Sequence, residues 1–128
     1  MIKGVKWYIL RLDFGDYAKG PAGSLESHVL GLIKKFNLVA ATVLKENYHY
    51  NIFGSPASTQ LFGARPGTKP IIMELYISEV KFDSFMTELE ELVLKGKSNI
   101  LYSKHEISSI IGNPSVFDKI DEYKKGDE

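Results

Sequence analysis

The middle of the chain is framed by the runs Leu38-Val39-Ala40-Ala41-Thr42-Val43-Leu44 and Ile71-Ile72-Met73-Glu74-Leu75-Tyr76-Ile77. Short apolar runs that are rich in β-branched residues and bounded by turn residues are typical of buried β-strands. About 25 residues separate the two runs, and connections of that length are uncommon in compact domains unless they are functional or disordered. We therefore expect two strands, with the functional element in the long loop between them.

Amphipathic helices are expected on either side of this pair of strands. Ser24 is a good N-cap, and Asn37 is a plausible stop for the helix that follows it. The apolar stripe of this helix consists of Leu25, Val29, Leu32, Ile33 and Phe36. A second helix is predicted to start after Ser78 and to end at Lys95-Gly96, where the glycine can adopt the left-handed cap conformation. Its stripe consists of Phe82, Phe85, Met86, Leu89, Leu92 and Val93.

Further strands at residues 6–13 and 100–106 complete the order β-α-β-β-α-β, which is typical of an α+β, ferredoxin-like sandwich. We assign residues 1–112 to this domain and residues 113–128 to a C-terminal helical tail with apolar residues at Val116, Phe117, Ile120 and Tyr123. Two helices can cover only one face of a four-stranded sheet. Because neither face of the first and third predicted strands is fully polar, the uncovered face is expected to pack against another copy of the chain.

The composition is that of one packed domain of 128 residues, with 44% hydrophobic and 25% charged residues. Sixteen basic and sixteen acidic residues give a net charge of zero, so no global basic field attracts nucleic acid or an anionic membrane. The absence of cysteine excludes disulfides, thiolate catalysis and cysteine-ligated metals. No apolar run is long enough to insert into a membrane, and a cytoplasmic protein is the expectation.

Several segments, taken in order between Trp7 and Ser103, resemble the PII-like signalling proteins and the small, uncharacterised branch of that superfamily. The run at residues 38–44 is similar to the segment Gly-x-Thr-Val that ends the second PII strand, and Ser58-Thr59-Gln60-Leu61-Phe62-Gly63-Ala64 is similar to the centre of the PII T-loop. Lys95-Gly96-Lys97 lies where PII proteins have Thr-Gly-Lys, and residues 16–21 are similar to the approach to the first helix in the small branch.

This resemblance implies a homotrimer that senses a small effector in clefts between subunits and engages a protein target through a flexible T-loop at about residues 46–68, without catalysis. The implied effector is an adenine nucleotide or another small anion. The residues implied for its binding are Thr42, Val43, Leu44, Arg65, Gly96 and Lys97. The residues implied for the partner-binding loop are Tyr48, His49, Tyr50, Phe53 and Phe62.

The chain departs from the PII pattern at the base of this loop and after the second helix. Residues 46–51 contain no glycine, and the phosphate-binding run after Gly96-Lys97 is shortened to Ser98-Asn99. Phe62 has no hydroxyl, so the uridylylation that some PII proteins undergo is excluded at this position.

Three alternatives follow from individual residues. Tyr48-His49-Tyr50 suggests a metal site in a small trimer of the same fold, although the other histidines show no ligand spacing. Exposed Trp7 or Tyr76 would suit an RNA-stacking sheet, but the basic patterns of such modules are absent. Glu74 and Glu79 could act as paired carboxylates for acid-base chemistry in a minimal enzyme, but no nucleophile is positioned beside a base.

Overall fold

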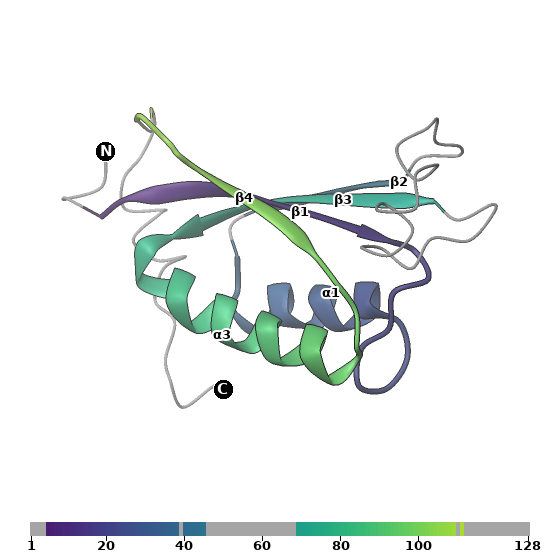
Figure 1. Ribbon diagram of the computed structural model, residues 1–128. Helices are drawn as coiled ribbons and strands as arrows, with labels where there is room; N and C mark the ends of the chain where they lie inside the picture. The colour runs from purple at the N-terminus through teal and green to yellow at the C-terminus, as the bar shows by residue number, and fades with distance from the viewer. Residues whose placement is uncertain (1–4, 39, 46–68, 110, 112–128) are drawn as a thin grey trace.

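The computed structural model describes residues 5–38, 40–45, 69–109 and 111 of the chain. Within these residues the elements follow in the order β1 (Trp7–Gly15), α1 (Leu25–Lys35), β2 (Ala40–Lys45), β3 (Pro70–Ser78), α3 (Glu79–Lys95) and β4 (Leu101–Glu106). The four strands form one antiparallel sheet in the order β2-β3-β1-β4. Both helices lie on the same face of this sheet (Figure 1), so the structure is an α+β fold consistent with a ferredoxin-like arrangement.

The sheet buries the alternate residues that the strand pattern predicts. In β1 the side chains of Leu10, Leu12 and Phe14 are buried, and their register partners in β3 are Leu75, Met73 and Ile71. The helices cover this core with two buried aromatic residues, Phe36 at the C-cap of α1 and Phe85 of α3. Their rings meet edge to face with centroids 5.5 Å apart. The predicted stripes of both helices therefore face the core.

Both helices end in the same hydrogen-bonded motif. After α1, Asn37 adopts the left-handed conformation (φ 50°), and the N–H groups of Asn37 and Leu38 donate to the carbonyls of Lys34 and Ile33. After α3, the left-handed residue is Lys97 (φ 53°), whereas Gly96 has an ordinary helical φ of −81°. The expectation that Gly96 takes the left-handed cap was therefore wrong by one residue, and Gly96 is glycine for another reason.

The other face of the sheet is covered by none of the described elements (Figure 1). Leu44, Tyr76 and Leu101 project from this face and expose between 42% and 50% of their surface. A polar row crosses its centre, where Thr42, Glu74, Arg11 and Ser103 are successive register partners. Trp7 lies on the same face but is only 3% exposed, so it offers no ring for base stacking. Among the described residues, no helix is long and apolar enough to cross a membrane.

Phe85→Ala tests whether the contact between the helices holds the core together. Because Phe85 is fully buried against Phe36, we expect this substitution to lower the free energy of unfolding by about 3–5 kcal/mol. Val80→Ala, on the exposed side of the same helix, should change it by less than about 0.5 kcal/mol. Urea unfolding at one fixed protein concentration measures both, and equal effects of the two variants would contradict this account of the core.

Candidate functional site

One end of the sheet brings together segments that are far apart in the sequence. The register pairs Gly15 with Pro70, Lys45 with Ile71 and Asp13 with Leu101. The end of β1, the end of β2 and the starts of β3 and β4 therefore lie at the same edge of the molecule, which we call the loop end. Both strands that flank the predicted T-loop, residues 46–68, reach the loop end.

The loop of residues 16–24 between β1 and α1 lies at the loop end and is held by its own hydrogen bonds. The N–H of Leu25 donates to the carbonyl of Ala18 over 2.9 Å, and the N–H of Gly20 donates to the carbonyl of Gly23 over 2.9 Å. Nε2 of His28 lies 2.8 Å from the carbonyl oxygen of Ala22, so the first turns of α1 also hold this loop. The loop surrounds an open depression of about 450 Å³.

This loop is joined to the turn between α3 and β4 through Ser98. The Ser98 hydroxyl donates to the carbonyl of Lys19 over 2.7 Å and accepts from the Lys19 N–H over 2.9 Å. A Cβ at Gly96 would overlap the carbonyl oxygen of Lys19, so only glycine allows this close approach of two backbones. We call this pair of hydrogen bonds the Lys19–Ser98 contact. The approach to α1 and the Gly96-Lys97 pair, which resembled PII segments separately, are thereby brought together.

The same loop is bonded to the strand that follows the predicted T-loop. The N–H of Asp16 donates to the carbonyl of Lys69 over 2.9 Å, and the Asp16 carboxylate accepts from the Lys69 N–H over 3.2 Å. Lys69 is the residue immediately before β3 and the first described residue after the predicted T-loop at residues 46–68. Any change in the position of Lys69 must therefore move or break these two bonds with Asp16.

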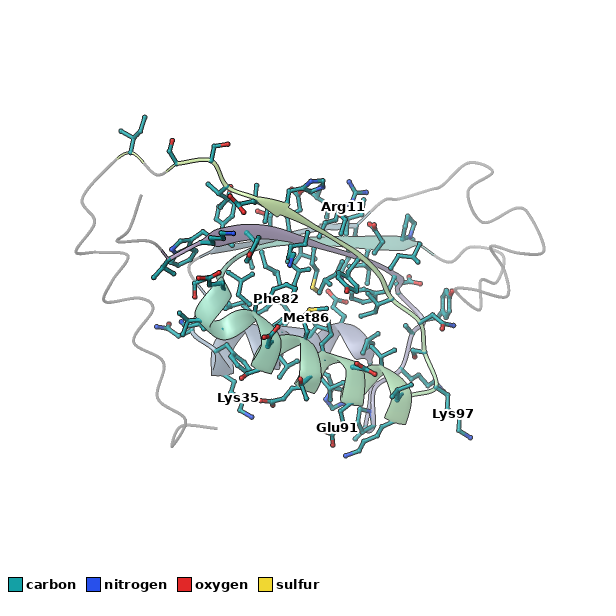
Figure 2. All side chains as sticks on the ribbon, turned by 60° about the vertical axis from the view of Figure 1, so that its left-hand side comes forward. Arg11, Lys35, Phe82, Met86, Glu91 and Lys97 are labelled. Carbon is teal, nitrogen blue, oxygen red and sulfur yellow. The ribbon has the colours of Figure 1, made fainter. Side chains whose placement is uncertain are left out.

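The turn at residues 96–98 offers side chains rather than backbone N–H groups to a ligand. The N–H groups of Gly96, Lys97 and Ser98 donate to the carbonyls of Leu92, Leu94 and Val93 in the last turn of α3. A phosphate would have to compete with these bonds. The Lys97 side chain is exposed, and Figure 2 shows it at the end of α3 directed away from the molecule. An anion at this turn would therefore bind mainly through the Lys97 ammonium group.

Thr42, Val43 and Leu44, the other predicted ligand residues in the described part of the chain, lie on β2. Thr42 and Leu44 are on the uncovered face and exposed, whereas Val43 packs against the core from the opposite face. Because β2 and β4 form the two edges of the sheet, one chain does not bring Thr42 and Leu44 next to Lys97. The predicted binding residues that the structure describes are thus separated by the width of the sheet, with Leu44 and Lys97 toward its loop end and Thr42 in the row that crosses its centre.

The remaining predicted residues lie outside the described part of the chain. These are Tyr48, His49, Tyr50, Phe53, Phe62 and Arg65. Within the described residues, no three acidic or histidine side chains gather in a group that could hold a metal ion. Glu74 projects from the uncovered face of the sheet and Glu79 begins α3, so they share no site.

Sequence reasoning did not identify Asp16, Lys19, Ser98 or Lys69 as individual site residues. Asp16 and Lys19 belong to the run at residues 16–21 that resembles the approach to the first helix, and Ser98 belongs to the shortened phosphate-binding run. A serine two residues after a helix-ending glycine is a weak signal by itself. Ser98 has this role only because the fold brings it to Lys19, which lies 79 positions earlier in the chain.

Tyr17 places a buried phenol in the same loop. Its hydroxyl is buried and has no hydrogen-bond partner among the described residues, and its ring lies where a Cβ on Gly15 would be. Burial, and to a smaller extent the charge of Asp16, raises the pKa of Tyr17 to about 12. This phenol is therefore neutral throughout the physiological range.

Comparison with known proteins gives little guidance to function. The sequence matches no protein-family model and no curated protein. Among solved structures, it is similar to the de novo designed protein Foldit4, with 11% identity, a TM-score of 0.41, and coverage of 83% of this chain and 99% of that one. It is also similar to the stable protein CutA1 from the psychrotrophic bacterium Shewanella sp. SIB1, with 8% identity, a TM-score of 0.44, and coverage of 93% and 95%.

Gly96→Ala tests the close approach behind the Lys19–Ser98 contact. The added methyl group meets the Lys19 carbonyl, so we expect the variant to lose about 1–3 kcal/mol of stability. Gly31→Ala is the matched control, because Gly31 lies within α1 with open space around its Cα, and alanine there should gain about 0.5–1 kcal/mol. Thermal and urea unfolding measure both, and a stabilising Gly96→Ala would contradict the contact.

Tyr17→Phe tests the burial of the phenol. Below pH 10 the hydroxyl is protonated in the folded and unfolded chain, so its ionisation contributes no pH dependence. Between pH 10 and about 12 the unfolded chain loses this proton while the folded chain retains it, so stability should fall as the pH rises. The stability of the parent chain relative to Tyr17→Phe should therefore decrease between pH 10 and 12, as measured by urea unfolding, while a constant difference would contradict the raised pKa.

Proposed function

We propose that this protein is a PII-like regulatory homotrimer that binds a small anionic effector in clefts between its subunits and signals through residues 46–68 to a protein target. The protein would carry out no reaction itself, and binding would change the conformation of that loop. The resemblance of the sequence to PII-like proteins suggests this function. Three features of the fold support it.

The observation that carries the proposal is a continuous set of hydrogen bonds at the loop end. The turn that presents Lys97 is bonded through Ser98 to Lys19, and Asp16 of the same loop is bonded to Lys69. The loop of residues 16–24 thus contacts both the turn at residues 96–98, which presents Lys97, and Lys69, the residue that follows the predicted T-loop. An anion that shifts this turn would act through the loop of residues 16–24 on the bonds that position Lys69.

The second feature is the separation of the predicted binding residues. Thr42 and Leu44 lie on one edge strand, and Lys97 precedes the other edge strand. In a ring of identical subunits, the β2 edge of one copy can lie beside the β4 edge of the next. A cleft of that kind would bring together residues that a single chain keeps apart. For this reason we propose that the effector binds between subunits.

The third feature is the uncovered face of the sheet. It combines exposed Leu44, Tyr76 and Leu101 with the polar row. The Nε of Arg11 in this row lies 3.2 Å from both carboxylate oxygens of Asp13, two residues along β1. Figure 2 shows Arg11 on this side, away from the helices. Burial of an apolar face between copies is favourable, and the pairing of Arg11 with Asp13 reduces the cost of burying its charge.

The effector class follows from the charges at the loop end. Lys19 and Lys97 are both exposed there, on the two segments joined by the Lys19–Ser98 contact. Ammonium groups on flexible side chains bind phosphate or carboxylate as point charges. An adenine nucleotide is the first ligand to test, with bicarbonate and common anionic metabolites next.

Lys97→Ala should weaken binding of the effector by about tenfold, because it removes the exposed charge at the α3–β4 turn. Lys34→Ala is the matched control on the exposed side of α1 and should leave affinity unchanged. Binding is measured by thermal shift and calorimetry with ATP, ADP, AMP and bicarbonate. Hydrogen exchange should show slower exchange of amides in residues 46–68 when the effector is bound.

The mass of the protein in solution provides the independent control. Three chains of 14.4 kDa should sediment together, and Tyr76→Lys on the uncovered face should dissociate them whereas Val80→Lys should not. A monomer would contradict the proposed assembly. A trimer that shows neither a thermal shift nor protection of residues 46–68 with any of these anions would contradict effector sensing while leaving the assembly intact.

A further inference from the structure

An apolar groove runs along the outer side of α3, where this helix lies beside β4. Its volume is about 270 Å³, and it is lined mainly by apolar residues of these two segments, including Met86, Glu90, Val93, Leu94, Ile100 and Tyr102. Figure 2 shows Met86 on the side of α3 that faces the sheet. The groove is separate from the uncovered sheet face, because Tyr102 pairs with Leu12 and points to the helix side.

The groove leaves more apolar surface exposed to solvent than the buried core of a folded domain does. Leu94 is 67% exposed and Tyr102 is 58% exposed, and both line the groove. The reason is that the layer of two helices is narrower than the four-stranded sheet. β4 is an edge strand, and only α3 lies near it, so the outer half of its helix-facing side has no covering element among the described residues.

We propose that the C-terminal segment of this chain, residues 114–123, docks in this groove as a third helix on the same face of the sheet. The inference does not depend on the proposed function. The segment lies outside the described residues, and its sequence supplies Pro114 for a first helical position and an apolar stripe at Val116, Phe117, Ile120 and Tyr123. A single apolar stripe needs one apolar surface to cover it, and the groove is such a surface.

The chain is long enough to reach the groove. β4 ends at Glu106, at the same end of the sheet where α3 begins, and the N–H of Ile107 still donates to the carbonyl of Trp7. The groove residue Tyr102 lies four strand residues back, about 14 Å from Glu106. Residues 107–113 can span up to about 23 Å, so they suffice to turn the chain and bring Pro114 to the start of the groove.

The dimensions of the segment also match the groove. A helix over residues 114–123 is about 15 Å long. The groove follows α3 from Met86 to Leu94, about 12 Å along the helix axis. Because the segment would enter at the Met86 end, it would run in the same direction as α3 and place Ile120 near Leu94.

Docking of this segment has a consequence for the neighbouring turn. The groove reaches Ile100, two residues after Ser98 of the Lys19–Ser98 contact. The docked segment would therefore cover one flank of the α3–β4 turn. It would also prevent another apolar partner from binding in the groove.

The absence of cysteine in this chain makes disulfide trapping the sharpest test. We expect the double variant Leu94→Cys/Ile120→Cys to form an intrachain disulfide under mild oxidation, because a docked segment brings the two Cα atoms within bonding range. Leu94→Cys/Asp118→Cys is the matched control. Asp118 is two residues from Ile120 and about 200° around a helix from it, so this pair should react at least about tenfold more slowly.

Non-reducing electrophoresis and mass spectrometry of tryptic peptides distinguish the outcomes. Fast intrachain bonding of the Ile120 pair with slow bonding of the Asp118 pair supports docking of the segment on its own chain. Equal rates for the two pairs would overturn the proposal, since the segment would then have no fixed face toward α3. Covalent dimers as the main product would also overturn it and would assign the groove to a second copy of the chain.

Discussion

The constraint on which the rest of this structure depends is that two helices cover one face of a four-stranded sheet. β1 lies inside the sheet between β3 and β4, and its buried residues Leu10, Leu12 and Phe14 are covered by α1 and α3. This arrangement produces one continuous core in which Phe36 and Phe85 meet. It also leaves two apolar surfaces without a described partner, the opposite face of the sheet and the groove beside β4. The two surfaces lie on opposite sides of the sheet.

The loop end owes its geometry to antiparallel pairing. Because neighbouring strands run in opposite directions, the connections that follow β1, β2 and α3 all return to the same end of the sheet. Hydrogen bonds then hold the loop of residues 16–24 against Lys69 on one side, through the Asp16 N–H and carboxylate, and against the Ser98 hydroxyl on the other, through the Lys19 backbone. Each of these bonds has a backbone group at one end or at both, so they link the positions of the segments. Gly96 is the residue whose small size allows its backbone to approach Lys19 closely. A signalling role for this end of the molecule is a proposal that follows from this coupling.

Most of the secondary structure could be predicted because it depends on local patterns. The strand runs at residues 38–44 and 71–77 and the two helical stripes correspond to β2, β3, α1 and α3, with their boundaries shifted by one or two residues. Ser24 caps α1 as predicted, since its hydroxyl accepts from the Ser27 N–H over 3.2 Å. The cap of α3 was misassigned, because Gly96 and Lys97 are adjacent and propensity alone favours glycine in the left-handed position. Lys81 was equally unpredictable: it is buried, and its ammonium group donates to the carbonyl of Asn37.

The sequence by itself determined the α+β class, the apolar face of each helix and the long connection between β2 and β3, because these depend on the spacing of apolar residues along one segment. Only the tertiary structure decided what Gly96 and Ser98 do, since their roles arise from Lys19, far away in the chain. Only the tertiary structure separated Thr42 and Leu44 from Lys97, because strand order, which no local pattern encodes, places β2 and β4 at opposite edges. Periodicity thus specified which residues are buried, and the pairing of distant strands specified which residues meet.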